Sequence, residues 1–244
     1  MILHIPHASL NVEGKEFLCD LRQELLRMSD RYTDEIFDHP EATRIIAPIS
    51  RLICDMERFE DDALEEMAVK GMGVCYTTNS FGTKLREVSP AEKTRILETY
   101  YRPHHHALEK AVEKELITCG HAIMVDCHSF SNVPLPHEYD QSTCRPDICI
   151  GTDPYHTPQW LIEKCVMFFL KAGLSVKLNA PFAGTLVPMK FYHSEPNVYS
   201  IMIEINRDLY MDVHGQKNDQ YTKICTIIQD VLQLLMNETT KFIK

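Results

Sequence analysis

The 244-residue sequence contains no run of about 18 apolar residues, which is the length that a membrane-spanning helix requires. Its N-terminus has neither a basic region nor a long apolar stretch, so we expect no secretory signal. No CxxC pair occurs, and the nine cysteines are odd in number and irregularly spaced. We therefore expect reduced, mostly buried thiols in a cytoplasmic protein.

Positive charge is also scarce. Lys and Arg total 25 against 35 Asp and Glu, which gives a formal net charge of −10. A nucleic-acid-binding protein would show a basic patch or stripe, so nucleic acid is not an expected partner. The lack of a long apolar run likewise gives no reason to expect a membrane as partner. A few local arginines can still bind an anionic small molecule. Hydrophobic residues make up 44% of the chain, and the length suits one α/β domain covering residues 1–244.

Strand-like and helix-like segments alternate along the chain, without repeats or low-complexity tracts. This order predicts an α/β fold in which helices flank a mixed, mostly parallel sheet. Ser89-Pro90-Ala91-Glu92 is a strong helix start, and Arg102-Pro103 is expected to end or kink the helix that follows. Residues 60–85 are irregular, which we interpret as a long excursion or lid. Predicted strands cover residues 1–5, 43–46, 52–54, 121–127, 147–150, 176–178 and 200–203, and further helices cover 15–28, 32–37, 105–116, 159–171 and 220–236.

Three of the predicted strands lead into residues that can bind a metal or act as a catalytic group beside it. His7 follows the first strand, His128 follows the run that starts at His121, and Glu204 follows an Ile-Met-Ile run. Ligands of open α/β sheets bind outside the carboxyl ends of the strands. Two imidazoles and a carboxylate delivered there resemble a hydrolytic zinc site.

Each of these residues also has a structural interpretation. His128 can be a structural histidine at a strand end, with Asp126, two residues earlier, orienting its ring. Glu204 lies within an apolar strand, where a carboxylate is costly unless it is paired or catalytic, and its alternative is an ion pair with Arg207. His4 lies three residues before His7 and is expected to face the other way.

Six segments carry a family resemblance: I-P-H-A-S, T-D-E-I-F, S-R-L-I-C-D-M-E-R-F-E-D-D, Y-R-P-H-H, V-D-C-H-S-F and I-E-I-N-R-D-L-Y-M. In this order they resemble the N-formylglutamate amidohydrolase family over residues 2–212. That family is similar in fold to the zinc carboxypeptidase and aspartoacylase group, so the resemblance implies a zinc-exopeptidase-like (phosphorylase/hydrolase-like) fold with one Zn²⁺. It implies His7 and His128 as metal ligands, Asp34 as the acidic ligand with Glu35 as the alternative, and Glu204 as the general base.

The resemblance also implies a small-molecule substrate, an N-formyl- or N-acyl-amino acid such as N-formylglutamate. Arg102 or Arg207 would help to stabilise the oxyanion. Within the run His104-His105-His106, on a predicted helix, at most one side chain is expected to face the site. The predicted substrate-binding residues are Arg51, Arg58, Asn179 and His105. The structural alternatives are ion pairs for the arginines and a turn cap for the asparagine.

Three positions depart from the pattern of the family. Ser9 and Thr185 replace glycines that the family commonly has, and Glu57 stands in D-M-E-R where the family commonly reads D-L-N-R. These changes bear on the substrate more than on the metal. Two further functions stay open, a zinc carboxypeptidase or amidase acting on peptide or cell-wall fragments, and a non-catalytic metal-binding protein. A pocket open to a chain would favour the first, and Glu204 argues against the second because metal binding does not require a base.

Overall fold

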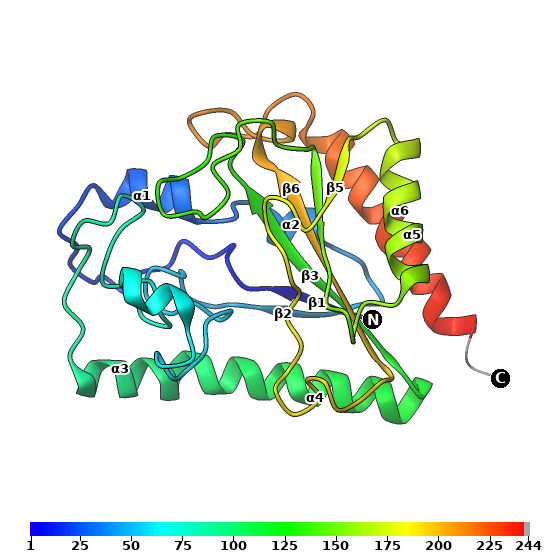
Figure 1. The fold of residues 1–244 in the computed structure, drawn as a ribbon, viewed down its shortest axis with the longest axis horizontal. Helices are drawn as coiled ribbons and strands as arrows, with labels where there is room; N and C mark the ends of the chain where they lie inside the picture. The colour runs from blue at the N-terminus through cyan, green and yellow to red at the C-terminus, as the bar shows by residue number, and fades with distance from the viewer. Residues whose placement is uncertain (242–244) are drawn as a thin grey trace.

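Six strands form one mixed sheet in the order β2-β1-β3-β6-β4-β5 in the computed structural model, which describes residues 1–241 and the side chains of residues 1–238 (Figure 1). Strands β1, β2, β3 and β6 run parallel to one another, whereas β4 is antiparallel to β6 and β5 is parallel to β4. The predicted fold class is therefore confirmed, and residues 242–244 of the predicted domain lie outside the described residues. The strands are β1 Ile2–Ile5, β2 Thr43–Ile46, β3 Ala122–Phe130, β4 Ile148–Gly151, β5 Val176–Leu178 and β6 Val198–Asn206.

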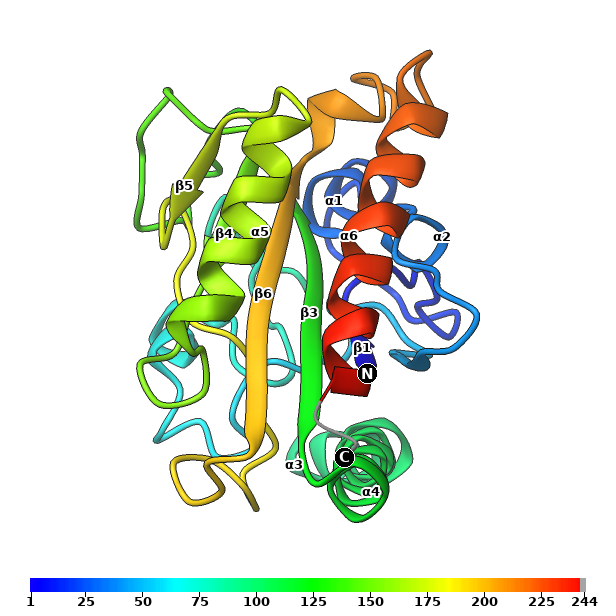
Figure 2. The same ribbon diagram turned by 90° about the vertical axis from the view of Figure 1, so that its right-hand side faces the viewer.

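Helices pack against both faces of the sheet (Figure 2). Helices α5 and α6 share one hydrophobic core with alternate residues of β3 and β6. Helix α4 packs on the opposite face, where Leu108 and Val112 contact the side of the sheet that carries Met124. Within the described residues, no helix has both the length and the hydropathy to cross a membrane. The helices are α1 Leu21–Met28, α2 Thr33–Ile36, η1 Glu66–Lys70, α3 Pro90–Ile96, η2 Leu97–Tyr101, α4 Arg102–Cys119, α5 Gln159–Lys171, η3 Arg207–Leu209 and α6 Tyr221–Lys241.

The alternation of side chains along the two long central strands positions the polar residues of the sheet. In β3, Ile123 and Val125 face α5 and α6, whereas Met124 faces α4. Because successive side chains of a strand point to opposite faces, Asp126 and His128 lie on the face of Met124.

Strand β6 follows the same alternation, so Glu204 lies on the face of Val198, which is again the face of α4. His128 is in register with Glu204, and His4 is in register with Asp126. This face therefore changes from apolar to polar toward the carboxyl ends of the parallel strands, which is the edge where the sequence predicts a ligand.

Several predicted boundaries are confirmed, including the strands at 43–46 and 176–178 and the helix at 159–171. The predicted strand at 52–54 is wrong, because these residues form a turn. The helix predicted from residue 15 begins only at Leu21. The cause is Asp20, whose side chain accepts a hydrogen bond from the backbone N–H of Gln23 and so caps the helix there.

Arg102-Pro103 does not end the helix that starts after Ser89. Helix α3 continues through the π-helical turn η2 directly into α4, with Pro103 in the first turn of α4. A proline ring in an α-helix clashes with the carbonyl group four residues earlier. The wider π-helical turn just before Pro103 changes that spacing, so the chain continues as a helix.

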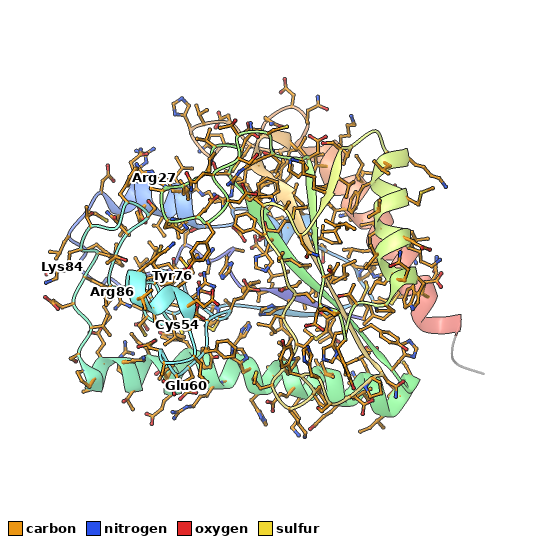
Figure 3. All side chains as sticks on the ribbon, viewed as in Figure 1. Arg27, Cys54, Glu60, Tyr76, Lys84 and Arg86 are labelled. Atoms are coloured by element: carbon orange, nitrogen blue, oxygen red, sulfur yellow. The ribbon has the colours of Figure 1, made fainter. Side chains whose placement is uncertain are left out.

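Residues 60–85 form a packed wall rather than a free lid. Tyr76 and Leu85 are 1% and 0% exposed and share a hydrophobic cluster with Leu52. The hydroxyl group of Tyr76 also donates a hydrogen bond of 2.6 Å to Asp55. Figure 3 places Tyr76 near Cys54, in the part of the molecule that lies away from α5 and α6. The segment therefore supports the polar edge of the sheet from the side.

Candidate metal and catalytic site

Two imidazoles and a carboxylate converge beyond the carboxyl ends of β1 and β3. Ligand-type atoms of His7, His128 and Glu57 all lie within 4.8 Å of one another. Glu57 Oε1 lies 3.0 Å from Nε2 of His128, and Glu57 Oε2 lies 3.7 Å from Nε2 of His7. The structure thus brings together the two histidines that the sequence predicts as metal ligands.

A second carboxylate, that of Asp30, faces the other nitrogen of each ring. Its Oδ2 atom lies 3.1 Å from Nδ1 of His128 and 3.5 Å from Nδ1 of His7. Its Oδ1 atom accepts a hydrogen bond of 2.7 Å from Arg207. Burial alone would raise the pKa of Asp30, but the contacts with His128 and His7 and the charge of Arg207 hold it well below its ordinary value. Asp30 is therefore an anion with one oxygen turned toward both rings.

Two further buried carboxylates fix the orientation of these rings. Nε2 of His7 lies 2.8 Å from Oδ1 of Asp55, whose other oxygen accepts the hydrogen bond from Tyr76. Nε2 of His128 lies 3.1 Å from Oδ1 of Asp126. An ionised carboxylate can only accept hydrogen bonds. His7 therefore donates its Nε2–H group to Asp55 and keeps its lone pair on Nδ1. Both nitrogens of His128 face carboxylates, Nε2 that of Asp126 and Nδ1 that of Asp30. Burial lowers the pKa of His128, but the charges of Glu57 and Asp126 and the contact with Asp30 hold it well above its ordinary value.

The resulting set of donor atoms fits a zinc ion. Nδ1 of His7 is buried and has no hydrogen-bond partner among the described side chains. Nδ1 of His7 and Nδ1 of His128 both face the anionic Oδ2 atom of Asp30, so a cation that takes the place of the Nδ1 proton of His128 would have three donor atoms around it. Zinc takes nitrogen and carboxylate ligands, and a ligating histidine typically donates its other N–H group to a carboxylate or carbonyl.

The structure does not bring Asp34 or Glu35 to these histidines. The backbone carbonyl of Asp34 accepts a hydrogen bond from Arg44, and Glu35 is an exposed residue. Both residues lie on α2, whereas Asp30 lies just before that helix. The structure therefore places Asp34 away from both rings, and Asp30 is the carboxylate buried beside them.

Glu204 lies in the same cavity as the two histidines and Asp30. Its side chain is 7% exposed, and its Oε2 atom has no hydrogen-bond partner within residues 1–238. Burial raises the pKa of Glu204 to about 8, against the neighbouring His128, which lowers it. The alternative of an ion pair with Arg207 is not realised, because that guanidinium pairs with Asp30. A buried carboxylate with an unpartnered oxygen is costly, which is typical of a working group.

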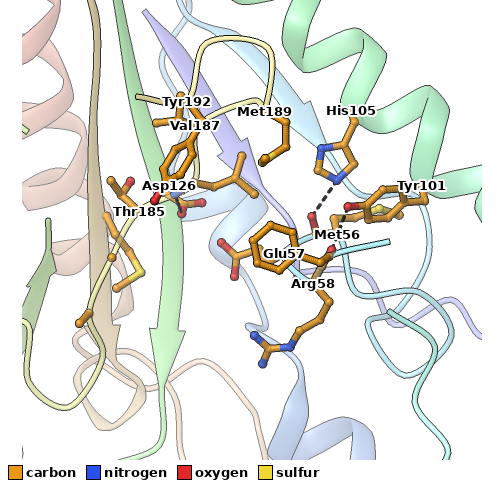
Figure 4. Close-up of a pocket in the computed structure, with 15 residues that line it drawn as sticks. Met56, Glu57, Arg58, Tyr101, His105, Asp126, Thr185, Val187, Met189 and Tyr192 are labelled. Atoms are coloured by element: carbon orange, nitrogen blue, oxygen red, sulfur yellow. Dashed lines mark hydrogen bonds between the residues drawn. The ribbon is translucent and has the colours of Figure 1, made fainter. Parts of the chain in front are cut away.

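Two adjoining cavities surround the cluster. The larger has a volume of about 710 Å³ and contains His7, His128 and Glu204 in its wall. The smaller has a volume of about 300 Å³ (Figure 4). Glu57 and Arg58 line both cavities and so mark the boundary between them.

The predicted substrate-binding arginines line the larger cavity, but they differ in availability. Arg51 uses Nε and Nη2 to bind Asp55, at 3.2 and 2.8 Å. Arg58 lies 3.7 Å from Asp55 and 3.9 Å from Glu65, and its Nε atom has no hydrogen-bond partner among the described side chains. Arg58 is therefore the cation better placed to receive an anionic group.

Of the other predicted site residues, His105 lies in the smaller cavity, whereas Arg102 and Asn179 lie outside both cavities. His105 lines the smaller cavity, where its Nε2 atom lies 2.9 Å from the carbonyl oxygen of Met56. The side chain of Arg102 is 53% exposed and pairs with Glu60, and it lines neither cavity. Asn179 bonds Thr152 and also lies outside both linings. Of the two arginines predicted to stabilise an oxyanion, only Arg207 lies at the site.

One buried and two half-buried histidines near the cavities predict a pH-dependent stability. Burial lowers the pKa of His104 to about 2 and those of His105 and His137 to about 4. The unfolded chain protonates these rings near pH 6.5, so below that pH the unfolded state binds more protons and stability falls. Glu204, whose pKa is raised, acts in the opposite sense, whereas Asp55 and Asp126, whose pKa values are lowered, add to the loss of stability near pH 4. We expect the melting temperature to fall between pH 6.5 and pH 4.

Differential scanning calorimetry across this range measures the effect. The substitution His137→Asn should make the fall shallower, whereas replacement of the exposed His106 should leave it unchanged. A melting temperature that stays constant from pH 6.5 to pH 4 would contradict the assignment of these rings as neutral.

Comparison with known proteins adds an independent finding. The sequence profile described as N-formylglutamate amidohydrolase matches residues 1–211. The chain is 24% identical over 234 residues to N-formylglutamate deformylase of Pseudomonas putida, a match that covers 87% of this chain and 82% of that protein. The solved structure of N-formylglutamate amidohydrolase from Ralstonia eutropha JMP134 matches with a TM-score of 0.85 at 19% identity, over 98% of this chain and 94% of that one. A solved protein from Agrobacterium tumefaciens matches with a TM-score of 0.65 at 17% identity, over 96% and 91% of the two chains.

Proposed function

This chain belongs to the N-formylglutamate amidohydrolase family, and we propose that it is a zinc-dependent enzyme that hydrolyses the amide bond of an N-formyl- or N-acyl-amino acid such as N-formylglutamate. One observation carries the proposal. Nδ1 of His7 and Nδ1 of His128 face Oδ2 of Asp30 in a cavity that also exposes Glu204, whose Oε2 atom lacks a hydrogen-bond partner among the described side chains. A ligand set beside a free base is what amide hydrolysis requires.

The zinc ligands in this proposal are Nδ1 of His7, Nδ1 of His128 and Oδ2 of Asp30. When bound, zinc lowers the pKa of a water molecule to about 7 and polarises the substrate carbonyl. Asp55 and Asp126 hold the two rings by their Nε2–H groups. Arg207 acts as a positioning residue, because it occupies the Oδ1 atom of Asp30 and leaves Oδ2 for the metal.

Glu204 is the general base. It accepts a proton from the attacking water while the water oxygen forms a bond to the carbonyl carbon. It then delivers that proton to the amide nitrogen as the carbon–nitrogen bond breaks. For N-formylglutamate the products are formate and glutamate, and Glu204 returns to its starting state. Burial raises the pKa of Glu204 to about 8, and the positive charge of a bound zinc would favour the carboxylate form that the base requires.

The direct test is a hydrolysis screen. Purified protein with one equivalent of zinc is incubated with N-formyl-, N-acetyl- and N-succinyl-amino acids, and release of the free amino group is measured. Hydrolysis of at least one of these substrates is the expected result. Failure with all of them, in protein that is folded and holds zinc, would refute the proposal.

Arg58 is expected to bind the side-chain carboxylate of the substrate. A hydrogen bond to a charged group is worth about 1.5–3 kcal/mol, so Arg58→Ala should lower kcat/KM for N-formylglutamate by about 10- to 100-fold. N-formylglutamine has the same shape without the charge and should lose less. Steady-state kinetics on the two substrates measure the difference, with Arg102→Ala as the matched control because Arg102 lies outside both cavities. Equal losses on both substrates would show that Arg58 does not bind this carboxylate.

A further inference from the structure

We propose that the smaller cavity is an acyl pocket, so that the enzyme acts better on amino acids with an apolar N-acyl chain of medium length than on N-formyl-amino acids. This inference rests on the proposed function, because it assigns a substrate group to the same reacting centre. The cavity holds about 300 Å³ and adjoins the larger one along Glu57 and Arg58.

The position of the smaller cavity follows from the pleat of the sheet. Asp126 and Met202 line it, and each lies two residues before a group of the reacting centre, His128 and Glu204. Residues two apart on a strand share a face and are about 7 Å apart. The cavity therefore begins two residues toward the amino ends of β3 and β6, on the same face of the sheet as His128 and Glu204. A chain attached to a carbonyl carbon near Glu204 can reach it.

The walls of this cavity are mostly apolar and its polar groups are largely occupied. Val187 and Met189 lie across from Tyr101 and His105 in Figure 4. The hydroxyl group of Tyr101 donates to the carbonyl oxygen of Arg58 at 2.8 Å, and Nε2 of His105 contacts the carbonyl oxygen of Met56. Asp126 and Thr185 are bonded as well, to His4 and Ser200. Away from Glu57 and Arg58 at the boundary, the cavity therefore favours a hydrocarbon chain.

The distribution of charge decides which end of the substrate enters which cavity. Arg51 and Arg207 line the larger cavity but not the smaller, and Arg58 stands at the boundary. Glu57, the acidic residue that both cavities share, points toward the interior of the smaller one in Figure 4 and would repel a carboxylate there. The amino-acid part, with its carboxylates, therefore belongs in the larger cavity. The acyl part is left for the smaller one.

A formyl group has no carbon beyond its carbonyl and would leave this space to water. Burying one methylene group is worth about 0.8 kcal/mol, which is about fourfold in kcat/KM. Each added methylene that fits should give this gain, until the chain exceeds the cavity.

The experiment compares N-formyl-, N-acetyl-, N-butyryl- and N-hexanoylglutamate with the zinc-loaded protein. We expect kcat/KM to rise about fourfold per methylene. Met189→Trp places a larger side chain at the cavity and should remove most of the gain between the acetyl and hexanoyl substrates. Met167→Trp, at an exposed position of α5 outside both cavities, is the matched control and should keep the gain. Val187→Phe tests the inner wall in the same way.

A second measurement separates this inference from the proposed function. Calorimetric binding of the same acyl series to the zinc-loaded Glu204→Gln variant requires no turnover. Affinity that rises with acyl length, and does so less in the double variant with Met189→Trp, supports the acyl pocket even if no substrate is hydrolysed. Affinity and kcat/KM that stay constant or fall from the formyl to the longer acyl substrates would overturn the inference. It would also be overturned if the loss of affinity in Met189→Trp depended on the amino-acid side chain of the substrate and not on the length of its acyl chain.

Discussion

Replacing Glu204 with Gln is expected to lower kcat by about 10²- to 10⁴-fold, the usual contribution of a positioned acid–base group. The amide keeps the size of the side chain but cannot accept the proton of the attacking water. It also removes a buried carboxylate that burial already disfavours, so the folded protein should not lose stability. Turnover of N-formylglutamate and zinc content should be measured on the same preparation, and zinc should remain at one per chain.

The matched control is Glu35→Gln, because Glu35 is exposed and pairs with Lys217 away from both cavities. That variant should keep its turnover. If Glu204→Gln turns over at the native rate, Glu204 is a structural residue and general base catalysis by its carboxylate is wrong.

Replacing Asp30 with Asn is expected to remove stoichiometric zinc. The change deletes the anionic oxygen between the two rings, and the loss of affinity should exceed the about 10- to 100-fold that follows from losing a residue that only orients a ligand. It also leaves Arg207 without its buried partner, and breaking such a pair costs about 3–5 kcal/mol. Zinc content must therefore be measured on material that circular dichroism shows to be folded.

Two further variants test which acidic residue binds the metal. Glu57→Gln tests the carboxylate that also lies within reach of both histidines, and Asp34→Asn tests the residue that the sequence points to. Both should retain zinc. If Glu57→Gln loses the metal while Asp30→Asn keeps it, the ion lies on the Nε2 side of the rings and Asp30 is not a ligand.

The architecture was predictable because the sheet is built from uninterrupted apolar runs. The runs that contain Val125 and Ile203 are buried on the face of α5 and α6, and they can form little other than central strands. Polar residues at the ends of these strands, such as His128 and Glu204, must then lie at one edge of the sheet. This position can be predicted without knowing the conformation of any loop. Local turn geometry was harder to predict. The strand expected at 52–54 failed because a short apolar run also fits a buried turn.

The carboxylate that lies beside the two histidines could not be predicted in this way. Asp30 and Asp34 are four residues apart in an irregular segment that includes the short helix α2, and sequence spacing does not say which side chain turns inward. The distinguishing features are three-dimensional: Arg207 and both histidines contact Asp30, and they come from distant parts of the chain. Arg102 failed as a site residue for the same reason, since the unbroken helix carries it to the surface beside Glu60.

Removal and return of zinc tests the central claim most directly. The protein is treated with a chelator until no metal remains, and turnover of an N-formyl- or N-acyl-amino acid is measured as zinc is added back. We expect an inactive metal-free protein whose folding is retained, and activity that rises linearly and stops at one zinc per chain. Full turnover by the metal-free protein, or activity that bears no relation to bound zinc, would contradict a zinc-dependent mechanism.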